Sequence, residues 1–293
     1  MSLSAQANPA SLFYAGGLTA TLLRQGLRLA QLMGPQLGGA LALRLFCSPL
    51  PPKFLGRRSL PAPWLAEDWA FEGSQLRAWR HAAAAATQRP RVLLVHGWGG
   101  RASQMRKLGE ALWQQGLDPV LLDLPAHGHS GGWSSHLPQW RRALFAAASR
   151  LGPLHGVVAH SLGAVAALSA AARGLPVQRL ALLATSAPPA TVLSWFGQAF
   201  GLGEASRQDL RKRLERLSDG PLAQFEPDWL GPHLHQPVLL IHDEQDRAAP
   251  LAHAEALAAV LPDCRLLRSR GLGHRRVLDH ISHVDAVCAH LGE

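Results

Sequence analysis

The chain has 293 residues, of which 47% are hydrophobic and 17% charged, and its formal net charge is +9. This length suffices for one large domain with a buried core, and the apolar fraction is that of an ordinary soluble globular protein. Since no apolar run reaches the roughly 20 residues of a membrane-spanning helix, and the N-terminus carries no charged secretory signal, we expect a cytoplasmic protein.

Charge and cysteine content exclude two further classes of protein. Only three of the 29 basic residues are lysines, and the arginines are scattered without an aromatic-interleaved stripe. We therefore expect no nucleic-acid partner. Cys47, Cys264 and Cys288 lie far apart and form no Cys-x-x-Cys pair, so they predict neither a disulfide framework nor a zinc site.

Residues 1–60 form a separate apolar region, in which we predict a helical extension. Apolar residues from Leu18 to Met33 recur at roughly helical spacing, and Gly34-Pro35 should end this first helix. A second helix is predicted from about Leu37 to Phe46. We expect the two helices to pack on the main domain. The alternative is an interfacial anchor, peripheral to the inner face of a membrane, in which arginines flank an apolar face.

The middle of the chain predicts a hairpin and then a parallel sheet. Two short strand signals, residues 68–71 and 75–79, are separated by a Glu-Gly-Ser turn. Beyond them, continuous apolar strands alternate with helices, which indicates a sheet covered on both faces. We predict an α/β fold with a mostly parallel central sheet, whose core is formed by residues 61–188 and 232–293. Its strand segments are residues 92–95, 120–122, 156–159, 180–183 and 238–241, and its helices include 104–115 and 140–151.

Residues 189–231 interrupt this alternation and are too long for a simple connection. They are rich in aromatic residues and contain a predicted helix from Ser206 to Leu217. We interpret them as a small inserted helical cap. Trp195, Phe196 and Phe200 are candidates for a substrate pocket beneath it, and packing within the cap is their alternative role.

Ser161 lies at the most informative position of the chain. The apolar run from Gly156 to Ala159 ends in His160-Ser161-Leu162-Gly163, and a helix-forming run follows at once. This order predicts strand, sharp turn and helix, with the serine at the apex near the positive end of the helix. A serine in that position is suited to attack a carbonyl carbon, whereas a helix N-cap is the simpler alternative.

Polar residues also follow the carboxyl ends of the other strands, where parallel α/β sheets place their active sites. The run from His96 to Gly100 follows one strand, and the run from Asp123 to Ser130 follows the next. A third run, His242 to Asp246, follows a later strand. Near the end, Gly271-Leu272-Gly273-His274 is expected to open the last helix.

Together these runs resemble the α/β-hydrolase superfamily, on its esterase and lipase side, over about residues 65–292. Residues 159–163 look like the nucleophile elbow, with Ala159 where the family usually has glycine. The run His96-Gly97-Trp98-Gly99-Gly100 is similar to the oxyanion loop, and residues 123–130 look like the usual post-strand turn. The chain order of serine, acid and histidine also matches.

The resemblance implies a cofactor-independent serine hydrolase that cleaves carboxylic esters through an acyl-enzyme. Ser161 would be the nucleophile, His274 the general base, and Asp246 the acid that orients the imidazole. The backbone N–H groups of Trp98 and Leu162 would bind the oxyanion.

Competing residues exist for the acid and the base. Asp243 lies nearer the strand end than Asp246, but it occupies the position of the family's usual glycine, so we favour Asp246. His280 and His283 lie within the final helical run and are weaker candidates than His274, which a glycine precedes.

The remaining histidines have simpler interpretations. His127 and His129 could bind a metal, but the chain has no further suitably spaced ligand, so we expect no metal. We expect His160 to pack beside the elbow, and we include His96 and His160 among the candidate pocket residues.

The predicted activity is hydrolysis of a small-molecule ester, with an apolar acyl group. An acyltransferase, a thioesterase or a carbon–carbon hydrolase could use the same three residues. A non-catalytic binding or membrane-associated protein of the same fold is the alternative from another class, although no member of the predicted triad is missing.

Overall fold

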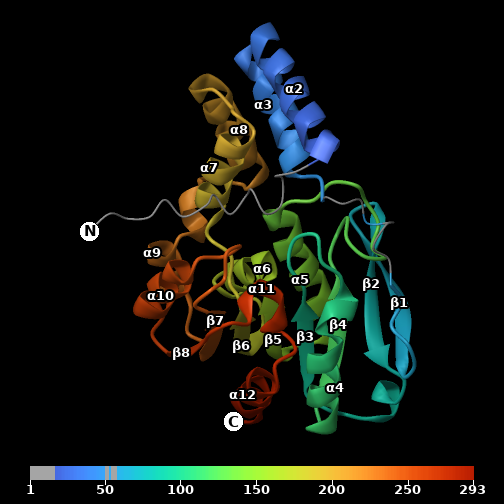
Figure 1. Ribbon diagram of the computed structural model, residues 1–293. Coiled ribbons are helices and arrows are strands. Elements are labelled where there is room, and N and C mark those ends of the chain that lie inside the picture. Colours follow the sequence, from blue (N-terminus) through green and yellow to red (C-terminus); the bar gives the residue numbers. More distant parts are fainter. Residues whose placement is uncertain (1–16, 50–52, 54–57) are drawn as a thin grey trace.

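The computed structural model describes residues 17–49, 53 and 58–293. Its centre is an eight-stranded sheet with the order β1-β2-β4-β3-β5-β6-β7-β8 (Figure 1). The strand β2 pairs antiparallel with both β1 and β4, and all other neighbours are parallel. The strands are β1 (Trp64–Phe71), β2 (Ser74–His81), β3 (Arg91–Val95), β4 (Asp118–Asp123), β5 (Leu154–His160), β6 (Val177–Leu183), β7 (Val238–Asp243) and β8 (Cys264–Ser269).

Helices cover both faces of this sheet, which confirms the predicted fold class. Successive side chains of a strand point to opposite faces, so Leu93 and Val95 join one buried cluster while Val92 and Leu94 join the other. The helices α5 and α6 contribute to the first cluster, and α4 and α12 contribute to the second. The helices of the core are α4 (Arg106–Gln114), α5 (Leu137–Leu151), α6 (Leu162–Ala171), α10 (Leu251–Val260), α11 (Gly273–Arg276) and α12 (Ile281–Gly292).

Two features near the C-terminus differ from the sequence-based expectation. The edge strand β8 was not predicted, because its burial alternates only weakly and arginines interrupt its apolar residues. The expectation that Gly271–His274 opens the last helix is wrong. His274 instead lies in the four-residue helix α11, and the last helix begins at Ile281. A separate short helix allows the His274 side chain to turn toward the sheet end while α12 packs on the sheet against β5, β6 and β7.

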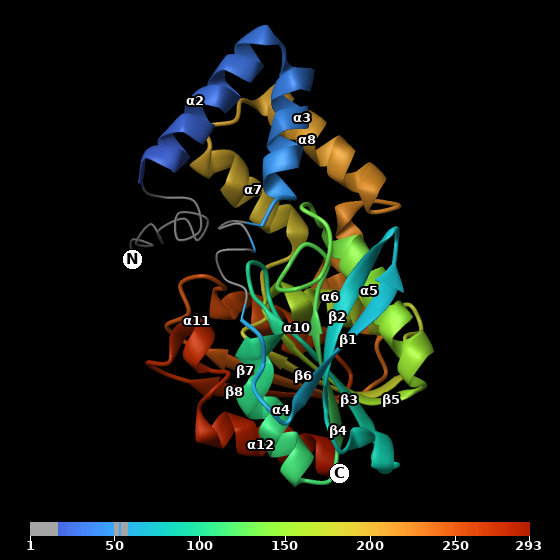
Figure 2. The ribbon, with the colours of Figure 1, turned by 90° about the vertical axis from the view of Figure 1, so that its right-hand side faces the viewer.

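The N-terminal helices and the cap helices form a layer beyond the carboxyl ends of the parallel strands (Figures 1 and 2). The cap contains α7 (Pro189–Ala199), α8 (Glu204–Leu217) and α9 (Pro227–Leu230), and the N-terminal hairpin consists of α2 (Gly17–Met33) and α3 (Pro35–Phe46). Both N-terminal helices were predicted, and they break at Gly34 as expected. None of the described helices combines the length and apolarity needed to cross a bilayer.

The N-terminal hairpin packs on the cap rather than on the sheet. Its helix α3 lies along α8. A Cβ at Gly39 would clash with the Asp209 side chain of α8, so glycine permits the close approach of the two helices. Gln31 also accepts a hydrogen bond from the backbone N–H of Gly203, 2.7 Å away. The division of the chain at residues 60, 188 and 231 stays a prediction.

Candidate active site

Ser161 stands at a strained turn between β5 and α6. Its φ of 55° and ψ of −122° are unusual for a residue with a side chain, and such strain persists only where the surroundings enforce it. Gly163 is part of that enforcement, since a Cβ there would clash with the carbonyl oxygen of His96. Ala159 remains in regular register with Val95 and Leu182, so its methyl group is accommodated within the sheet.

His274 bridges Ser161 and Asp246. Its Nε2 lies 3.0 Å from Ser161 Oγ, and its Nδ1 lies 2.7 Å from Asp246 Oδ2. The other carboxylate oxygen of Asp246 accepts the backbone N–H groups of Ala248 and Ala249 at 2.8 and 2.9 Å. Burial raises the pKa of Asp246, but the hydrogen bond from His274 and these backbone donors outweigh it and lower the pKa overall. An ionised carboxylate therefore orients the imidazole toward the serine.

Asp243 has a different set of neighbours. It is fully buried and accepts hydrogen bonds from Ser269 Oγ at 3.0 Å and from the Leu272 N–H at 2.9 Å. These donors, with further backbone N–H groups, lower its pKa against the opposing effect of burial. Asp243 thus holds the loop that leads to His274 and makes no contact with the imidazole.

His280 and His283, the competing bases, lie away from Ser161. The Nδ1 of His280 is 2.8 Å from Ser282 Oγ, and the Nδ1 of His283 is 3.1 Å from the carbonyl oxygen of Val277. Both therefore belong to the beginning of α12 and take no part in the contact with the elbow.

Two residues that line a cavity together with Ser161 have backbone N–H groups without an acceptor in the described part of the chain. They are Leu162, the first residue of α6, and Trp98, which follows β3. The first N–H groups of any helix lack intrahelical partners, so Leu162 can donate to a developing oxyanion. Leu162 and Trp98 line the same cavity as Ser161, so their role as oxyanion donors stays a prediction that this arrangement permits.

Buried histidines hold the loop that carries Trp98. His127 Nε2 accepts the Gly99 N–H at 3.0 Å, and its Nδ1 donates to the Pro125 carbonyl oxygen at 2.9 Å. His96 is also fully buried, and its Nε2 accepts the Leu124 N–H at 3.0 Å. Burial lowers the pKa of His127 to about 3, so the ring stays neutral, as its acceptor role requires.

His127 and His129 do not share a ligand site. The His129 ring lies beside Asp123, with 3.6 Å between Nδ1 and the carboxylate, whereas both ring nitrogens of His127 are already hydrogen-bonded. Across residues 17–49, 53 and 58–293, no three His, Cys, Asp or Glu side chains gather in a way that could hold a metal ion.

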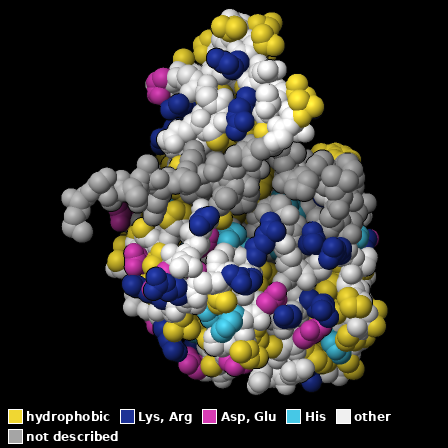
Figure 3. Space-filling model, in the orientation of Figure 1, with side chains coloured by type: hydrophobic (Ala, Val, Ile, Leu, Met, Phe, Trp, Pro, Cys, Tyr) yellow, Lys and Arg dark blue, Asp and Glu magenta, His cyan; other side chains and the backbone are white. Residues whose placement is uncertain are grey.

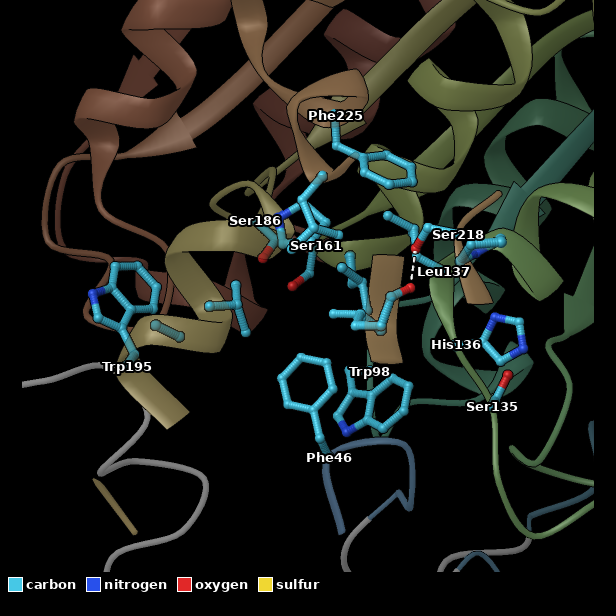
Figure 4. Close-up of a pocket in the computed structure, with 17 residues that line it drawn as sticks. Phe46, Trp98, Ser135, His136, Leu137, Ser161, Ser186, Trp195, Ser218 and Phe225 are labelled. Carbon is cyan, nitrogen blue, oxygen red and sulfur yellow. Dashed lines mark hydrogen bonds between the residues drawn. The ribbon is translucent and has the colours of Figure 1, made fainter. Parts of the chain in front are cut away.

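A cavity opens in front of Ser161 (Figure 4). The space between its walls, with the part that is open to solvent included, amounts to about 960 Å³, and no Asp, Glu, Lys or Arg side chain of the described residues lines it. Burial lowers the pKa of His136, a histidine in the wall, which favours its neutral form. Most of the wall is apolar: Phe46, Trp98, Leu137, Pro138, Leu162, Pro189, Val192, Trp195, Leu214, Leu222, Phe225 and Ala248.

Of the five candidate pocket residues, Trp195 lines this cavity and the other four lie outside its wall. Phe196 and Phe200 are buried behind it, with ring centroids 4.6 Å apart, because they form the apolar face by which α7 packs. His96 and His160 are buried beneath the elbow and use their ring nitrogens in hydrogen bonds to backbone groups. These four residues shape the site indirectly.

Phe46 lines the cavity but was not predicted as a cavity residue. It ends α3, more than a hundred residues before the elbow, and its ring packs edge-on against Phe196 with centroids 5.3 Å apart. Nothing in the local pattern of the N-terminal hairpin indicates this position, since the hairpin reaches the cavity only by packing on the cap.

Comparisons with known proteins agree with this architecture. A family model described as the alpha/beta hydrolase fold matches residues 90–235. The pimeloyl-[acyl-carrier protein] methyl ester esterase of Aromatoleum aromaticum is 31% identical over 246 residues, covering 66% of this chain and 94% of that protein. The chain belongs to the α/β-hydrolase family. A protein of the same name from Xanthomonas campestris pv. campestris strain B100 is 30% identical, covering 67% of this chain and 92% of its own.

Solved α/β-hydrolase structures superimpose on the same core. A membrane phospholipase A matches with a TM-score of 0.60 and 18% identity, covering 78% of this chain and 86% of that one. Est1E from Butyrivibrio proteoclasticus matches with a TM-score of 0.59 and 19% identity, covering 78% and 96%. At these identities the likeness concerns the fold.

Proposed function

We propose that this α/β hydrolase cleaves carboxylic esters with an apolar acyl group, through a covalent acyl-enzyme on Ser161. One observation carries the proposal: the hydrogen-bonded series Ser161–His274–Asp246 faces an apolar cavity. The base His274 lies within hydrogen-bond distance of both the nucleophile and the orienting carboxylate, which is the geometry that serine acyl transfer requires.

In the first half of the reaction, Ser161 Oγ bonds to the acyl carbon while His274 Nε2 accepts the hydroxyl proton. The N–H groups of Leu162 and Trp98 donate to the resulting oxyanion, and Asp246 stabilises the imidazolium. When the tetrahedral intermediate collapses, the bond to the alcohol oxygen breaks, and the leaving alcohol takes the proton from His274.

In the second half, a water molecule attacks the acyl carbon and transfers a proton to His274. The collapse of this second intermediate breaks the bond to Ser161 Oγ, returns the proton to the serine, and releases the carboxylic acid. No cofactor enters this cycle, and every proton passes through His274 Nε2.

The wall of the cavity supports an apolar acyl group as the substrate. A cavity lined by aromatic and aliphatic side chains, without a charged group to bind a second carboxylate, favours burial of a hydrocarbon chain. The names of the two relatives, both methyl ester esterases, support an ester as the bond that is cleaved.

The proposal is tested with p-nitrophenyl esters from acetate to laurate and with a fluorophosphonate probe. We expect turnover with a preference for the longer chains, and the variant Ser161→Ala should lose about three orders of magnitude in kcat or more, together with probe labelling. Ser186→Ala is the matched control, because Ser186 lines the same cavity but its hydroxyl forms no hydrogen bond to a histidine of the described residues. Turnover and labelling that survive in Ser161→Ala would contradict the proposal.

A further inference from the structure

The N-terminal hairpin exposes an unusual number of large apolar side chains. Their exposed fractions range from 38% at Leu41 to 84% at Leu32. Elsewhere in the described residues, comparable exposure occurs only at Leu65, Trp133, Leu217 and Ile281, which are far apart in the chain. We call the set on α2 and α3 the outer face, and its members are Leu18, Leu22, Leu29, Leu32, Met33, Leu37 and Leu41.

Helix α2 is apolar on two opposite sides. Its inner side carries the buried residues Ala20, Leu27 and Ala30. On this side of the helix, Arg24 Nε donates to the Ala199 carbonyl oxygen of α7 at 3.0 Å. The members of the outer face on α2 are separated by four, seven, and then three or four residues, spacings that return to one side of a helix. Packing on the cap explains the inner side only, so the outer face needs another explanation.

The charges carried by α2 and α3 themselves are all positive, while the neighbouring α8 carries acidic residues such as Glu204 and Asp209. No Asp or Glu precedes Glu67 in the sequence, whereas α2 and α3 carry Arg24, Arg28 and Arg44. Arg28 and Arg44 are exposed and form no ion pair within the described residues. Figure 3 shows hydrophobic side chains gathered at the tip formed by the hairpin, with Lys and Arg side chains below them. An apolar face bordered by cations is complementary to an anionic lipid surface.

We propose that the outer face of the α2–α3 hairpin docks on the anionic surface of a phospholipid bilayer and lies within the interface. A helix of 17 residues is about 25 Å long, which is shorter than the roughly 30 Å hydrocarbon core, so α2 lies along the bilayer and does not cross it. A second copy of this chain is a poorer occupant of the outer face, because it would bring the arginines of two hairpins together.

The structure also connects the docking surface to the cavity through one helix. Leu41 belongs to the outer face of α3, and Phe46, little more than one turn later, lines the cavity in front of Ser161. Docking would thus involve α3, the helix that contributes Phe46 to the cavity wall. This consequence alone rests on the proposed function; the docking itself does not.

The test measures flotation of the full-length protein with vesicles. We expect binding to mixed phosphatidylcholine–phosphatidylglycerol vesicles, and binding about a hundredfold weaker for the double variant Leu22→Glu, Leu29→Glu, which replaces two exposed apolar side chains of the outer face by charges. The matched control is Leu65→Glu, Ile281→Glu, since both residues are comparably exposed but lie outside the hairpin. Circular dichroism and thermal melting should show that both double variants fold like the wild type.

A second arm tests the role of charge. Arg28→Gln and Arg44→Gln should each weaken binding to the anionic vesicles about fivefold, and added salt should weaken the wild type. Vesicles of phosphatidylcholine alone should bind less than the anionic ones. Because the readout is vesicle binding, an inactive enzyme would contradict the proposed function and leave this result unaffected.

Two outcomes would overturn the proposal. One is wild-type protein that floats with neither kind of vesicle. The other is equal binding of the wild type and the Leu22→Glu, Leu29→Glu variant. A dimer that dissociates in this variant, without any lipid binding, would identify the outer face as a contact between copies of the chain instead.

Discussion

His160 donates its Nε2 hydrogen to the carbonyl oxygen of His274, 2.8 Å away, and their ring centroids are 4.7 Å apart. The residue before the elbow serine therefore holds the backbone of the residue that faces the serine. Burial lowers the pKa of His160 to about 3, so the ring stays neutral and the bond is a neutral one. The elbow and the C-terminal loop are joined here independently of the contact between Ser161 and the His274 side chain.

This bond predicts a positioning role for His160. In His160→Ala the loop bearing His274 loses its anchor, and a small displacement of the base should lower kcat about ten- to a hundredfold with little change in KM. His160→Gln, which retains an N–H donor, should recover part of the rate. A change in KM without a change in kcat would contradict this role. So would a rate for His160→Gln that is no higher than that of His160→Ala.

Asp246 and Asp243 should differ in what their loss affects. Asp246→Asn removes the charge that orients His274, so kcat should fall about ten-thousandfold while the melting temperature changes little. Asp243→Asn leaves the His274 imidazole paired but weakens the loop around Leu272, so it should mainly lower stability. Steady-state kinetics and thermal melting of both variants provide the comparison, and a greater loss of activity in Asp243→Asn would reverse the assignment.

Gly163 should tolerate no side chain. In Gly163→Ala the new methyl group would meet the His96 carbonyl oxygen, and we expect a loss of about 1–3 kcal/mol in the free energy of unfolding. Gly26→Ala is the matched control, because nothing lies within 4 Å of its Cβ position in α2. There the same substitution should raise stability by about 0.5–1 kcal/mol. Urea unfolding measures both, and similar signs for the two variants would refute the argument.

Stability should fall in acid because of the buried neutral histidines. Unfolded His127 and His160 gain protons near pH 6.5, whereas the folded residues do so only at about 3. Between these values the unfolded state holds more protons, so each residue lowers the free energy of unfolding by about 1.4 kcal/mol per pH unit as the pH falls. The stability of the folded state is therefore highest above pH 6.5, the pKa of these histidines in the unfolded chain, and it is lost as the pH falls below this value. The lowered pKa of Asp123 acts in the same direction below about pH 4.

The acid sensitivity is measured by urea unfolding across this range. His127→Gln retains a donor and an acceptor but cannot titrate, so the slope of stability against pH should decrease by about one proton. An unchanged slope in this variant would show that His127 is not a buried neutral group in the folded state.

Phe225 should limit the length of the acyl chain. It lies in the wall of the main cavity and also in that of a second, small hollow lined by Val165, Leu168 and His253 among others. Phe225→Ala should join the two spaces and shift the preference among p-nitrophenyl esters toward longer chains. Phe200→Ala is the control, since Phe200 is equally buried but lines neither cavity. Equal shifts in both variants would indicate a general loosening of the cap.

The arrangement of elements follows closely from local sequence. Continuous apolar strands, helical periodicity and the small residues around Ser161 depend on neighbours within a few positions, so the parallel sheet and the strand–turn–helix at the elbow were predictable. The edge strand β8 was not, because only one side of an edge strand is paired and its residues need not be uniformly apolar.

By itself, the sequence determined the α/β fold, the position of the elbow serine and the existence of two N-terminal helices, since each of these is encoded by short-range pattern. Tertiary structure alone decided that Asp246 rather than Asp243 faces His274, and that Phe46 of α3 enters the cavity wall. It also decided which side of α2 is left exposed. The reason is physical: these outcomes depend on contacts between segments far apart in the chain, and no local propensity specifies which distant surface a side chain will meet.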